Sequence, residues 1–397
     1  MGATAHDTPV WTDGDVKYMT WWFSKYKVTQ EDIIHFVAHT LKMTTPGKLQ
    51  SYHHTAHNIS LTISFRDGRI AIIRFPKPGK IASIFMEEKV RNEVQVLDFL
   101  REKTTIPVPR VYSWGMTKDS PRNIGPFVIL EHVEGETLCN MLPPPTTTNP
   151  GQEVLSPNHP QLAHIYEQIA DYMLQVAQFD FTAIGTISKS LSGEWTASNR
   201  PLTSTMNDLA TSMPNYPIQD FPTHPFKTTD SYLQHPINKH PIHTQTQHNL
   251  SSSSSNQHHH HAANNTGGGD GGPFKLTCHH AFRPTNLIAR LDHTSHRLTI
   301  TGFHEFDFVN TMPVQFTFDP PSWLAGTTVA GRGLGEGHQA DAFKQTYERF
   351  LHIFLTEMER VEARWRAKGR RCDVLLSARM REAWARGGLR GVGEGEW

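Results

Sequence analysis

The chain has 397 residues, with 38 basic and 38 acidic side chains and 37% hydrophobic residues. This length suggests two or three structural units, and the hydrophobic content is enough for a core. A net charge of zero argues against a general nucleic-acid or anionic-membrane binder, because such proteins gather phosphates with a basic surface. Cys139, Cys278 and Cys372 are odd in number and far apart, so neither a disulfide framework nor a CxxC metal site is expected.

The first residues show no basic segment followed by an apolar one, and no apolar run of about 20 residues occurs in the sequence. From this pattern we expect a soluble, cytoplasmic protein that does not contact membrane or nucleic acid. The sequence gives no indication of its oligomeric state.

The first strong pattern is a β-hairpin. Leu61, Ile63 and Phe65 alternate with polar residues, Asp67-Gly68 is typical of a tight turn, and the apolar residues Ile70, Ile72 and Phe75 follow. Apolar residues then recur at helical spacing over 86–103, which predicts an amphipathic helix that ends before Pro107. Two strands are expected next, at 110–114 and 127–133.

A further helix is predicted by apolar residues between 166 and 176, and the character of the chain changes after it. Over 212–272, Pro, His, Thr, Ser and Gly replace the apolar periodicity, which predicts a disordered insertion. Four consecutive histidines, 258–261, could bind zinc or nickel, although a low-complexity loop is the simpler interpretation. Strands at 286–291 and 298–303 and a long helix over 343–365 follow.

Several sequence motifs, in their order along the chain, resemble those of the aminoglycoside phosphotransferase-like family of fungal type. In the N-terminal part they are AIIRFPKPG, EEKVRNEVQVLDFLREKTTIPVPRVYSWG and GPFVILEHVEGETL. In the C-terminal part they are GPFKLTCHHAFRPTNLI, LTITGFHEFDF, FTFDPPSWL and LSARMREAW. The resemblance covers roughly residues 45–210 and 272–390.

The resemblance implies an α+β, protein-kinase-like fold with a small β-rich lobe and a mostly helical lobe. We expect a helical extension at 1–44, the small lobe at 45–135, the first part of the large lobe at 136–211, the insertion at 212–272 and the remaining large lobe at 273–390. The family transfers phosphate from ATP to a small-molecule hydroxyl with the help of Mg²⁺, so ATP, Mg²⁺ and such an acceptor are the expected ligands.

The resemblance places the nucleotide-binding residues in the small lobe. Arg74 falls where the family holds the phosphates, and Glu93 falls where a carboxylate orients that cation. A solvent-facing ion pair without a ligand is the alternative for these two residues. Asn58 stands in the segment that would cover the phosphates, which contains no glycine. Glu131 and Val133 would lie in the linker that contacts adenine.

The catalytic loop departs from the family pattern. Five residues before Asn286, the expected metal-binding Asn, stands Ala281 in place of the Asp that accepts the hydroxyl proton. A methyl group accepts no proton, and His280 is the weak candidate for a substitute base because imidazole has a suitable pKa range. Glu305 occupies the second metal-ligand position, normally Asp, and Asp307 is its rival if the strand register slips by two.

Three functions follow from this pattern. The first is a slow small-molecule kinase, the second is a pseudoenzyme that binds nucleotide or another ligand without efficient transfer, and the third is a decayed or mis-spliced family copy. The second is favoured, because Arg74, Glu93 and Asn286 are retained while the position of the catalytic base is lost.

Overall fold

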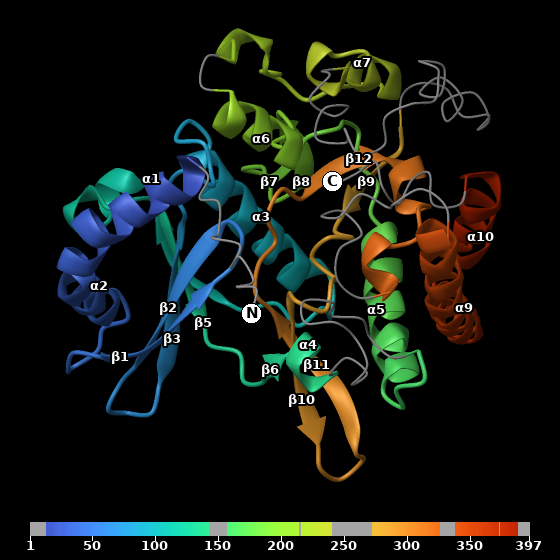
Figure 1. Cartoon of the computed structure of the whole chain (residues 1–397), viewed down its shortest axis with the longest axis horizontal. Helices are drawn as coiled ribbons and strands as arrows, with labels where there is room; N and C mark the ends of the chain where they lie inside the picture. Colours follow the sequence, from blue (N-terminus) through green and yellow to red (C-terminus); the bar gives the residue numbers. More distant parts are fainter. Residues whose placement is uncertain are drawn as a thin grey trace, which may run out of the picture. The chain divides into compact units, whose positions relative to one another are not determined.

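The computed structural model describes residues 13–142, 157–213, 216–239, 272–325, 338–372 and 374–387 (Figure 1). The chain divides into two compact units. Unit 1 contains Met1–Val94, Arg110–His132 and Asn207–Tyr216. Unit 2 contains Gln95–Pro109, Val133–Met206 and Pro217–Trp397.

Unit 1 is built on an antiparallel sheet whose strands follow the order β1-β2-β3-β5-β4. Its elements are α1 (Asp13–Trp21), the π-helix η1 (Trp22–Tyr26), α2 (Lys27–Thr40), β1 (Lys48–His54), β2 (Asn58–Ser64), β3 (Ile70–Pro76), the start of α3 (Met86–Lys103), β4 (Val111–Gly115) and β5 (Phe127–Glu131). A single helix therefore separates the third and fourth strands of the sheet along the chain, as the protein-kinase-like fold requires.

Alternation along β2 gives the sheet two chemically different faces. One face carries fully buried apolar side chains, and it packs with the N-terminal helices in a single core. This core includes Trp21, Tyr26, Ile33, Val37, Ile59, Leu61, Ile63, Ile73 and Phe75. Ser60 of β2 pairs with Arg74 of β3 and with His53 of β1. Paired residues share one face of a sheet, so these three polar side chains lie together on the opposite face. The sheet therefore presents a polar surface on the side away from the helices α1 and α2.

Unit 2 is mainly helical and carries short strand pairs. Its elements are the end of α3, β6 (Glu136–Thr137), α4 (Leu138–Met141), α5 (Leu162–Ala177), β7 (Thr186–Lys189), β8 (Trp195–Asn199), the start of α6 (Ser204–Ser212), α7 (Thr229–Leu233), β9 (Phe274–Thr277), β10 (Leu287–Asp292), β11 (Arg297–Phe303), β12 (Asn310–Pro313), α9 (His338–Ala367) and α10 (Leu376–Gly387).

The aromatic stripe of α9 forms the core of unit 2. Phe354 meets Tyr166 of α5 edge to face with ring centroids 5.5 Å apart, and the Tyr166 hydroxyl donates to Leu324 O at 2.7 Å. The buried Glu362 accepts hydrogen bonds from Ser377 N at 3.0 Å and Ser377 Oγ at 2.6 Å, which fixes the start of α10. The predicted long helix is therefore confirmed as a packed scaffold element.

Most predicted elements are confirmed. The hairpin turns at Gly68, whose φ of +87° suits glycine, and the predicted helix matches the observed Met86–Lys103. β5 ends at Glu131, two residues before the predicted end. The structure also holds strands that were not predicted, among them β1, whose residues are mostly exposed and show no apolar alternation.

The expected disordered tract differs from the structure in its first part. Residues 216–239 form short helices, and their apolar side chains Tyr216, Phe221, Tyr232 and Ile237 are buried. Composition misled the prediction here, since widely spaced apolar residues can pack without helical or strand periodicity. Residues 240–271, with the histidine run, lie outside the described residues.

Candidate functional site

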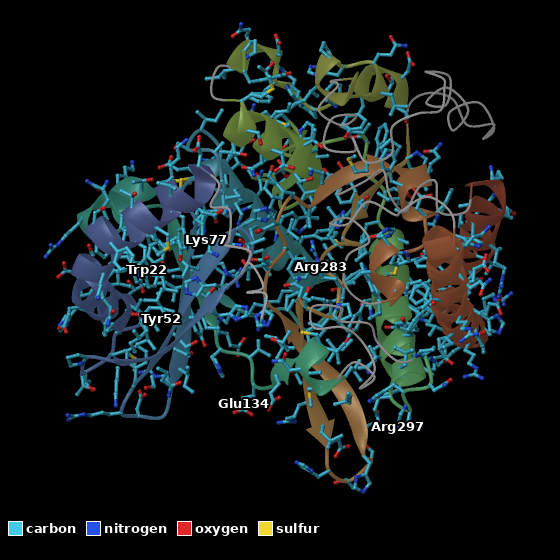
Figure 2. The ribbon with its side chains drawn as sticks, viewed as in Figure 1. Trp22, Tyr52, Lys77, Glu134, Arg283 and Arg297 are labelled. Carbon is cyan, nitrogen blue, oxygen red and sulfur yellow. The ribbon has the colours of Figure 1, made fainter. Side chains whose placement is uncertain are left out.

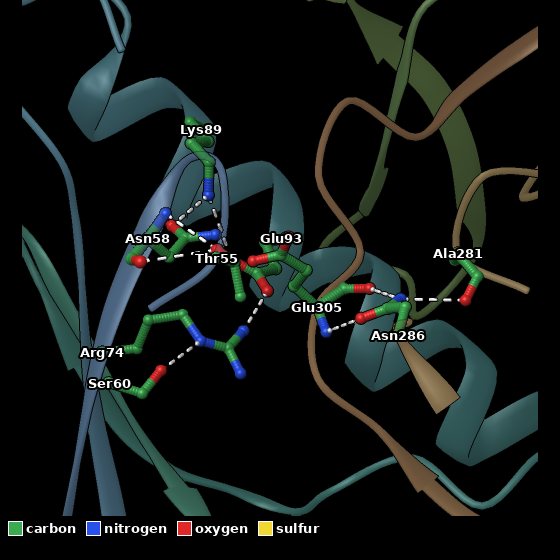
Figure 3. Close-up of polar contacts among 9 residues, drawn as sticks. All are labelled: Thr55, Asn58, Ser60, Arg74, Lys89, Glu93, Ala281, Asn286 and Glu305. Carbon is green, nitrogen blue, oxygen red and sulfur yellow. Dashed lines mark hydrogen bonds and ion pairs between the residues drawn. The ribbon is translucent and has the colours of Figure 1, made fainter. Parts of the chain in front are cut away.

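Arg74 and Glu93 form an ion pair inside unit 1, as expected from their sequence positions (Figure 3). The Arg74 Nη1 donates to Glu93 Oε1, and its Nε donates to Ser60 Oγ at 3.3 Å. β3 supplies the cation from the polar face of the sheet, and α3 supplies the carboxylate. Arg74 is 5% exposed and Glu93 is 2% exposed, so the solvent-facing pair considered above is not what the structure contains.

Lys89 joins the pair and was missed by the sequence reasoning. Its Nζ donates to Asn58 Oδ1 at 2.8 Å and lies 3.5 Å from Glu93 Oε2. The signal was present in the sequence, because Lys89 stands four residues before Glu93 and therefore on the same face of α3. We call Asn58, Ser60, Arg74, Lys89 and Glu93 the Arg74 cluster. All of them are buried.

The turn between β1 and β2, residues 55–57, closes next to this cluster. Thr55 N donates to Asn58 O at 3.0 Å, and Asn58 N donates to Thr55 Oγ1 at 3.0 Å. These reciprocal bonds shape the turn without a glycine. Lys77, which directly follows β3, donates from Nζ to Thr55 O at 2.5 Å and from its backbone N to His57 O at 2.7 Å.

His53 and His54 lie at the end of β1. Burial and the neighbouring charge of Arg74 lower the pKa of His53, and burial together with Lys77 lowers the pKa of His54. Both imidazoles are therefore neutral at pH 7. His53 shares its sheet face with Ser60 and Arg74.

The expected adenine linker spans the boundary between the units. Glu131 belongs to unit 1, where its N donates to Arg110 O at 2.8 Å and its Oε2 accepts from Arg110 N at 3.1 Å. Val133 belongs to unit 2 and lies against Gly302 of β11, where an added Cβ would come within 2.7 Å of Val133 Cγ1. Their contact with a nucleotide stays a prediction.

In unit 2 the loop over 278–286 lacks a carboxylate at its expected base position. Ala281 is 5% exposed, and its backbone takes part in two hydrogen bonds, from its N to Cys278 O at 2.9 Å and from Asn286 Nδ2 to its O at 2.8 Å. Both hydrogen bonds at position 281 therefore involve its backbone and not its side chain.

His280, the substitute base of the sequence prediction, is a weak base in this environment. Its Nε2 is buried and has no hydrogen-bond partner among the described residues, although the residue as a whole is partly exposed. Burial, with smaller contributions from Arg283 and His279, lowers its pKa to about 3. An imidazole of that pKa is a poor acceptor for a hydroxyl proton at neutral pH.

Asn286 joins two loops of unit 2 (Figure 3). Its Nδ2 donates to Ala281 O at 2.8 Å and to Glu305 O at 2.6 Å, and its Oδ1 accepts from Glu305 N at 2.9 Å. We call this arrangement the Asn286 loop pair. Both amide hydrogens and the carbonyl oxygen of the side chain are therefore used to hold backbone groups.

This arrangement fits a magnesium ion poorly. Mg²⁺ demands near-octahedral oxygen coordination, and Asn286 Oδ1 is already engaged by the Glu305 amide. The side chains of Glu305 and Asp307 are both partly exposed, and the described residues contain no group of three or more His, Cys, Asp or Glu side chains that could hold a metal. The ligand roles of Asn286, Glu305 and Asp307 stay predictions, and no chemical step is derived through a metal.

Comparison with curated proteins finds yeast relatives over part of the chain. The chain is 27% identical over 142 residues to "Altered inheritance of mitochondria protein 9, mitochondrial" of Debaryomyces hansenii, and 26% identical over 139 residues to the protein of that name in Saccharomyces cerevisiae. Each match covers 35% of this chain and 21% of the relative. The chain therefore matches about a fifth of the length of these relatives.

These relatives overturn one expectation. Their name describes them as mitochondrial, so the cytoplasmic location expected from the sequence is wrong. None of the helices in the described part of the chain is long and apolar enough to cross a bilayer.

Comparison with solved structures finds phosphotransferases at low identity. Macrolide 2'-phosphotransferase type I is 13% identical with a TM-score of 0.35, covering 98% of this chain and 95% of that chain. Amicoumacin kinase hAmiN, solved with AMP-PNP, Ca²⁺ and Ami, is 9% identical with a TM-score of 0.41, covering 86% and 82%. Similarity at this level assigns no role to any residue.

No protein-family model matches the chain. The order β1-β2-β3-β5-β4, with α3 between β3 and β4, itself carries the fold assignment. The chain has an α+β, protein-kinase-like fold, and it is similar to small-molecule phosphotransferases and, over part of its length, to the yeast mitochondrial relatives.

Proposed function

We propose that unit 1 binds the phosphate groups of a nucleotide of the ATP class, and that transfer of phosphate to a small-molecule hydroxyl is impaired in this chain. The observation that carries the proposal is the buried Arg74 cluster, in which two cations share one carboxylate, beside the replacement of the catalytic carboxylate by Ala281. Binding groups are kept, and the proton acceptor is lost.

The chemistry of Arg74 suits this role. A guanidinium stays charged at any physiological pH and matches the geometry of phosphate oxygens. Glu93 orients it from α3, and Ser60 fixes its Nε. A buried cation of this kind interacts with an anionic ligand more strongly than an exposed one, since the surrounding dielectric is lower.

Loss of the base limits the chemistry without abolishing it. General-base catalysis contributes about 10²- to 10⁴-fold in rate, while positioning of the phosphoryl group supplies much of the remainder. His280 does not replace the base effectively at a pKa of about 3. The proposal is therefore a nucleotide-binding protein without efficient transfer.

Nucleotide binding is tested by thermal unfolding of the full chain with ATP. A ligand at 100 times its Kd stabilises the folded state by about 2.7 kcal/mol, so a rise in Tm is expected. Arg74→Gln should lose this rise, whereas Arg69→Gln, which changes an exposed arginine paired with Asp67, should keep it. Since the Asn286 loop pair fits Mg²⁺ poorly, the rise should persist in EDTA. No rise at millimolar ATP would contradict the proposal and favour a decayed copy.

Impaired transfer is tested by Ala281→Asp. Restoring the carboxylate should raise ATP consumption by about 10²-fold or more. If the wild-type chain already consumes ATP as fast as this variant, transfer is not impaired and the active, slow small-molecule kinase is the correct alternative.

A further inference from the structure

We propose that helix α1 braces the β1–β2 turn, and that Tyr18 and Lys77 are the positioning residues through which it sets the nucleotide affinity of unit 1. This inference rests on the proposed function for its link to the nucleotide, but its structural part can be tested separately. It concerns the N-terminal helix, which the family resemblance, beginning near residue 45, does not cover.

Lys77 bonds to both ends of the turn. Lys77 Nζ donates to Thr55 O at 2.5 Å, and Lys77 N donates to His57 O at 2.7 Å. Both bonds end on backbone carbonyls at the two ends of the 55–57 turn. Lys77 is 8% exposed, so its ammonium–carbonyl bond is shielded from water and correspondingly strong.

Tyr18 of α1 contacts both Lys77 and the residue that leads into the turn. The Lys77 ammonium lies 4.9 Å from the centroid of the Tyr18 ring, a cation–π distance. The Tyr18 hydroxyl lies 3.1 Å from His54 Nδ1. Burial raises the pKa of Tyr18 and lowers that of His54, so this hydrogen bond joins a protonated tyrosine to a neutral imidazole. Figure 2 labels Lys77 beside Trp22 and Tyr52 in this part of unit 1.

The backbone around Lys77 is also fixed against α1. Asp15 pairs with Lys80 at 2.7 Å. Gly79 has a φ of +86°, and a Cβ added there would come within 2.6 Å of Gly14 O. The close approach of the two glycines means that the segment following β3 lies directly on the first turn of α1, so a shift of α1 displaces Lys77.

Hydrogen bonds connect the turn to the Arg74 cluster. Asn58 N is held by Thr55 Oγ1, and Asn58 Oδ1 accepts from Lys89 Nζ at 2.8 Å. A continuous chain of contacts therefore runs from Tyr18 through Lys77 and Thr55 to Asn58. A turn braced in advance does not have to be ordered when a ligand binds, which raises affinity.

The experiment measures hydrogen exchange and nucleotide affinity on the full chain. Lys77→Met and Tyr18→Phe are compared with Tyr52→Phe, which removes a neighbouring tyrosine hydroxyl bonded to Gln30 Oε1 at 2.6 Å and not to the turn. We expect exchange of the amides at 55–58 to rise about ten-fold or more in Lys77→Met, the size expected for loss of a hydrogen bond to a charged group. Tyr18→Phe should give a smaller rise, and Tyr52→Phe none.

The possible outcomes test two claims separately, namely that α1 braces the turn and that this brace raises nucleotide affinity. If the amides at 55–58 exchange faster in Lys77→Met and Tyr18→Phe, and ATP raises the Tm of these variants several-fold less than that of wild type, both the brace and its role in affinity are supported. If the amides at 55–58 exchange no faster in Lys77→Met and Tyr18→Phe than in Tyr52→Phe, the brace is overturned. Faster exchange with unchanged ATP affinity overturns its role in affinity. If wild type shows no response to ATP, the proposed function fails, and the exchange data alone still decide whether the brace exists.

Discussion

The Arg74 cluster and the Asn286 loop pair are both held together by hydrogen bonds from buried side chains, but the groups that these side chains hold differ. In the cluster, side chains hold side chains, and the charges of Arg74 and Lys89 converge on Glu93. In the loop pair, one side-chain amide holds the backbone of residues 281 and 305. The cluster therefore depends on the identity of each residue. In the loop pair, the bond to Asn286 requires only the backbone carbonyl at 281, which every amino acid has.

The expected base position illustrates this difference. Any replacement of Ala281 that fits the space keeps the bond to Asn286, so the loop retains its shape while its chemistry changes. No residue of the Arg74 cluster has this freedom.

Glu93→Gln should lower the free energy of unfolding by about 3 kcal/mol or more, because it leaves two buried cations without the carboxylate that they share. Urea unfolding measures the change. Glu87→Gln is the matched control on the same helix, since Glu87 is exposed and its bond to Thr117 N survives as an amide contact. If both variants lose the same free energy of unfolding, the buried cluster is no more sensitive to substitution than the exposed surface of α3.

Asn286→Ala should lower the free energy of unfolding by about 1–3 kcal/mol, because it removes the hydrogen-bond partner of three backbone groups. Urea unfolding again measures the loss, and Asn199→Ala on β8 is the exposed control. Hydrogen exchange at the Glu305 amide should accelerate. An unchanged exchange rate there would contradict the loop pair.

Stability should fall as the pH is lowered from about 6.5 towards 4. Burial lowers the pKa of His279 to about 4 and that of His280 to about 3, whereas the unfolded chain takes up these protons near 6.5. Protons therefore bind the unfolded state first, and the folded state loses its advantage over this range. His280→Gln should flatten the decline of the urea midpoint with pH. A slope identical to that of wild type would contradict the prediction.

Ala281→Gly should have the smallest effect, a loss of less than about 1 kcal/mol, because it removes only a methyl group and keeps the carbonyl. The Glu305 amide should exchange as in wild type. A loss comparable to that of Asn286→Ala would show that the side chain at 281 does shape the loop, and the contrast with the Arg74 cluster would disappear.

The sequence predicts the local elements of this fold better than its long-range contacts. The helix at 86–103 is readable because Val90, Val94 and Leu97 repeat at helical spacing, and the Arg74–Glu93 pair follows from the family words. Lys89 was within reach of the same spacing argument. The bonds of Asn286 were not, since they depend on how two loops 19 residues apart meet in space.

The features that were not predicted, or were predicted wrongly, have physical reasons that differ from place to place. β1 escaped notice because its residues are mostly exposed and do not alternate in polarity. Residues 216–239 looked disordered by composition, yet Phe221 and Tyr232 are buried. The brace of α1 could not be foreseen, because it joins Tyr18 and His54 across 36 positions of sequence.

The π-helix at Trp22–Tyr26 determines how α1 responds to the loss of a residue. It lies between α1 and α2 without a break in helical backbone, and a π-turn holds one residue more than an α-turn. Deleting Ser24 would therefore convert the π-turn into an α-turn and leave α1 in its present rotational phase. Deleting a second residue has no surplus to remove, and because each residue of an α-helix turns the chain by about 100°, everything before it would rotate by that angle. Tyr18 would then leave His54 and Lys77. The contacts of α1 should therefore survive the loss of one residue between Trp22 and Tyr26 but not the loss of two.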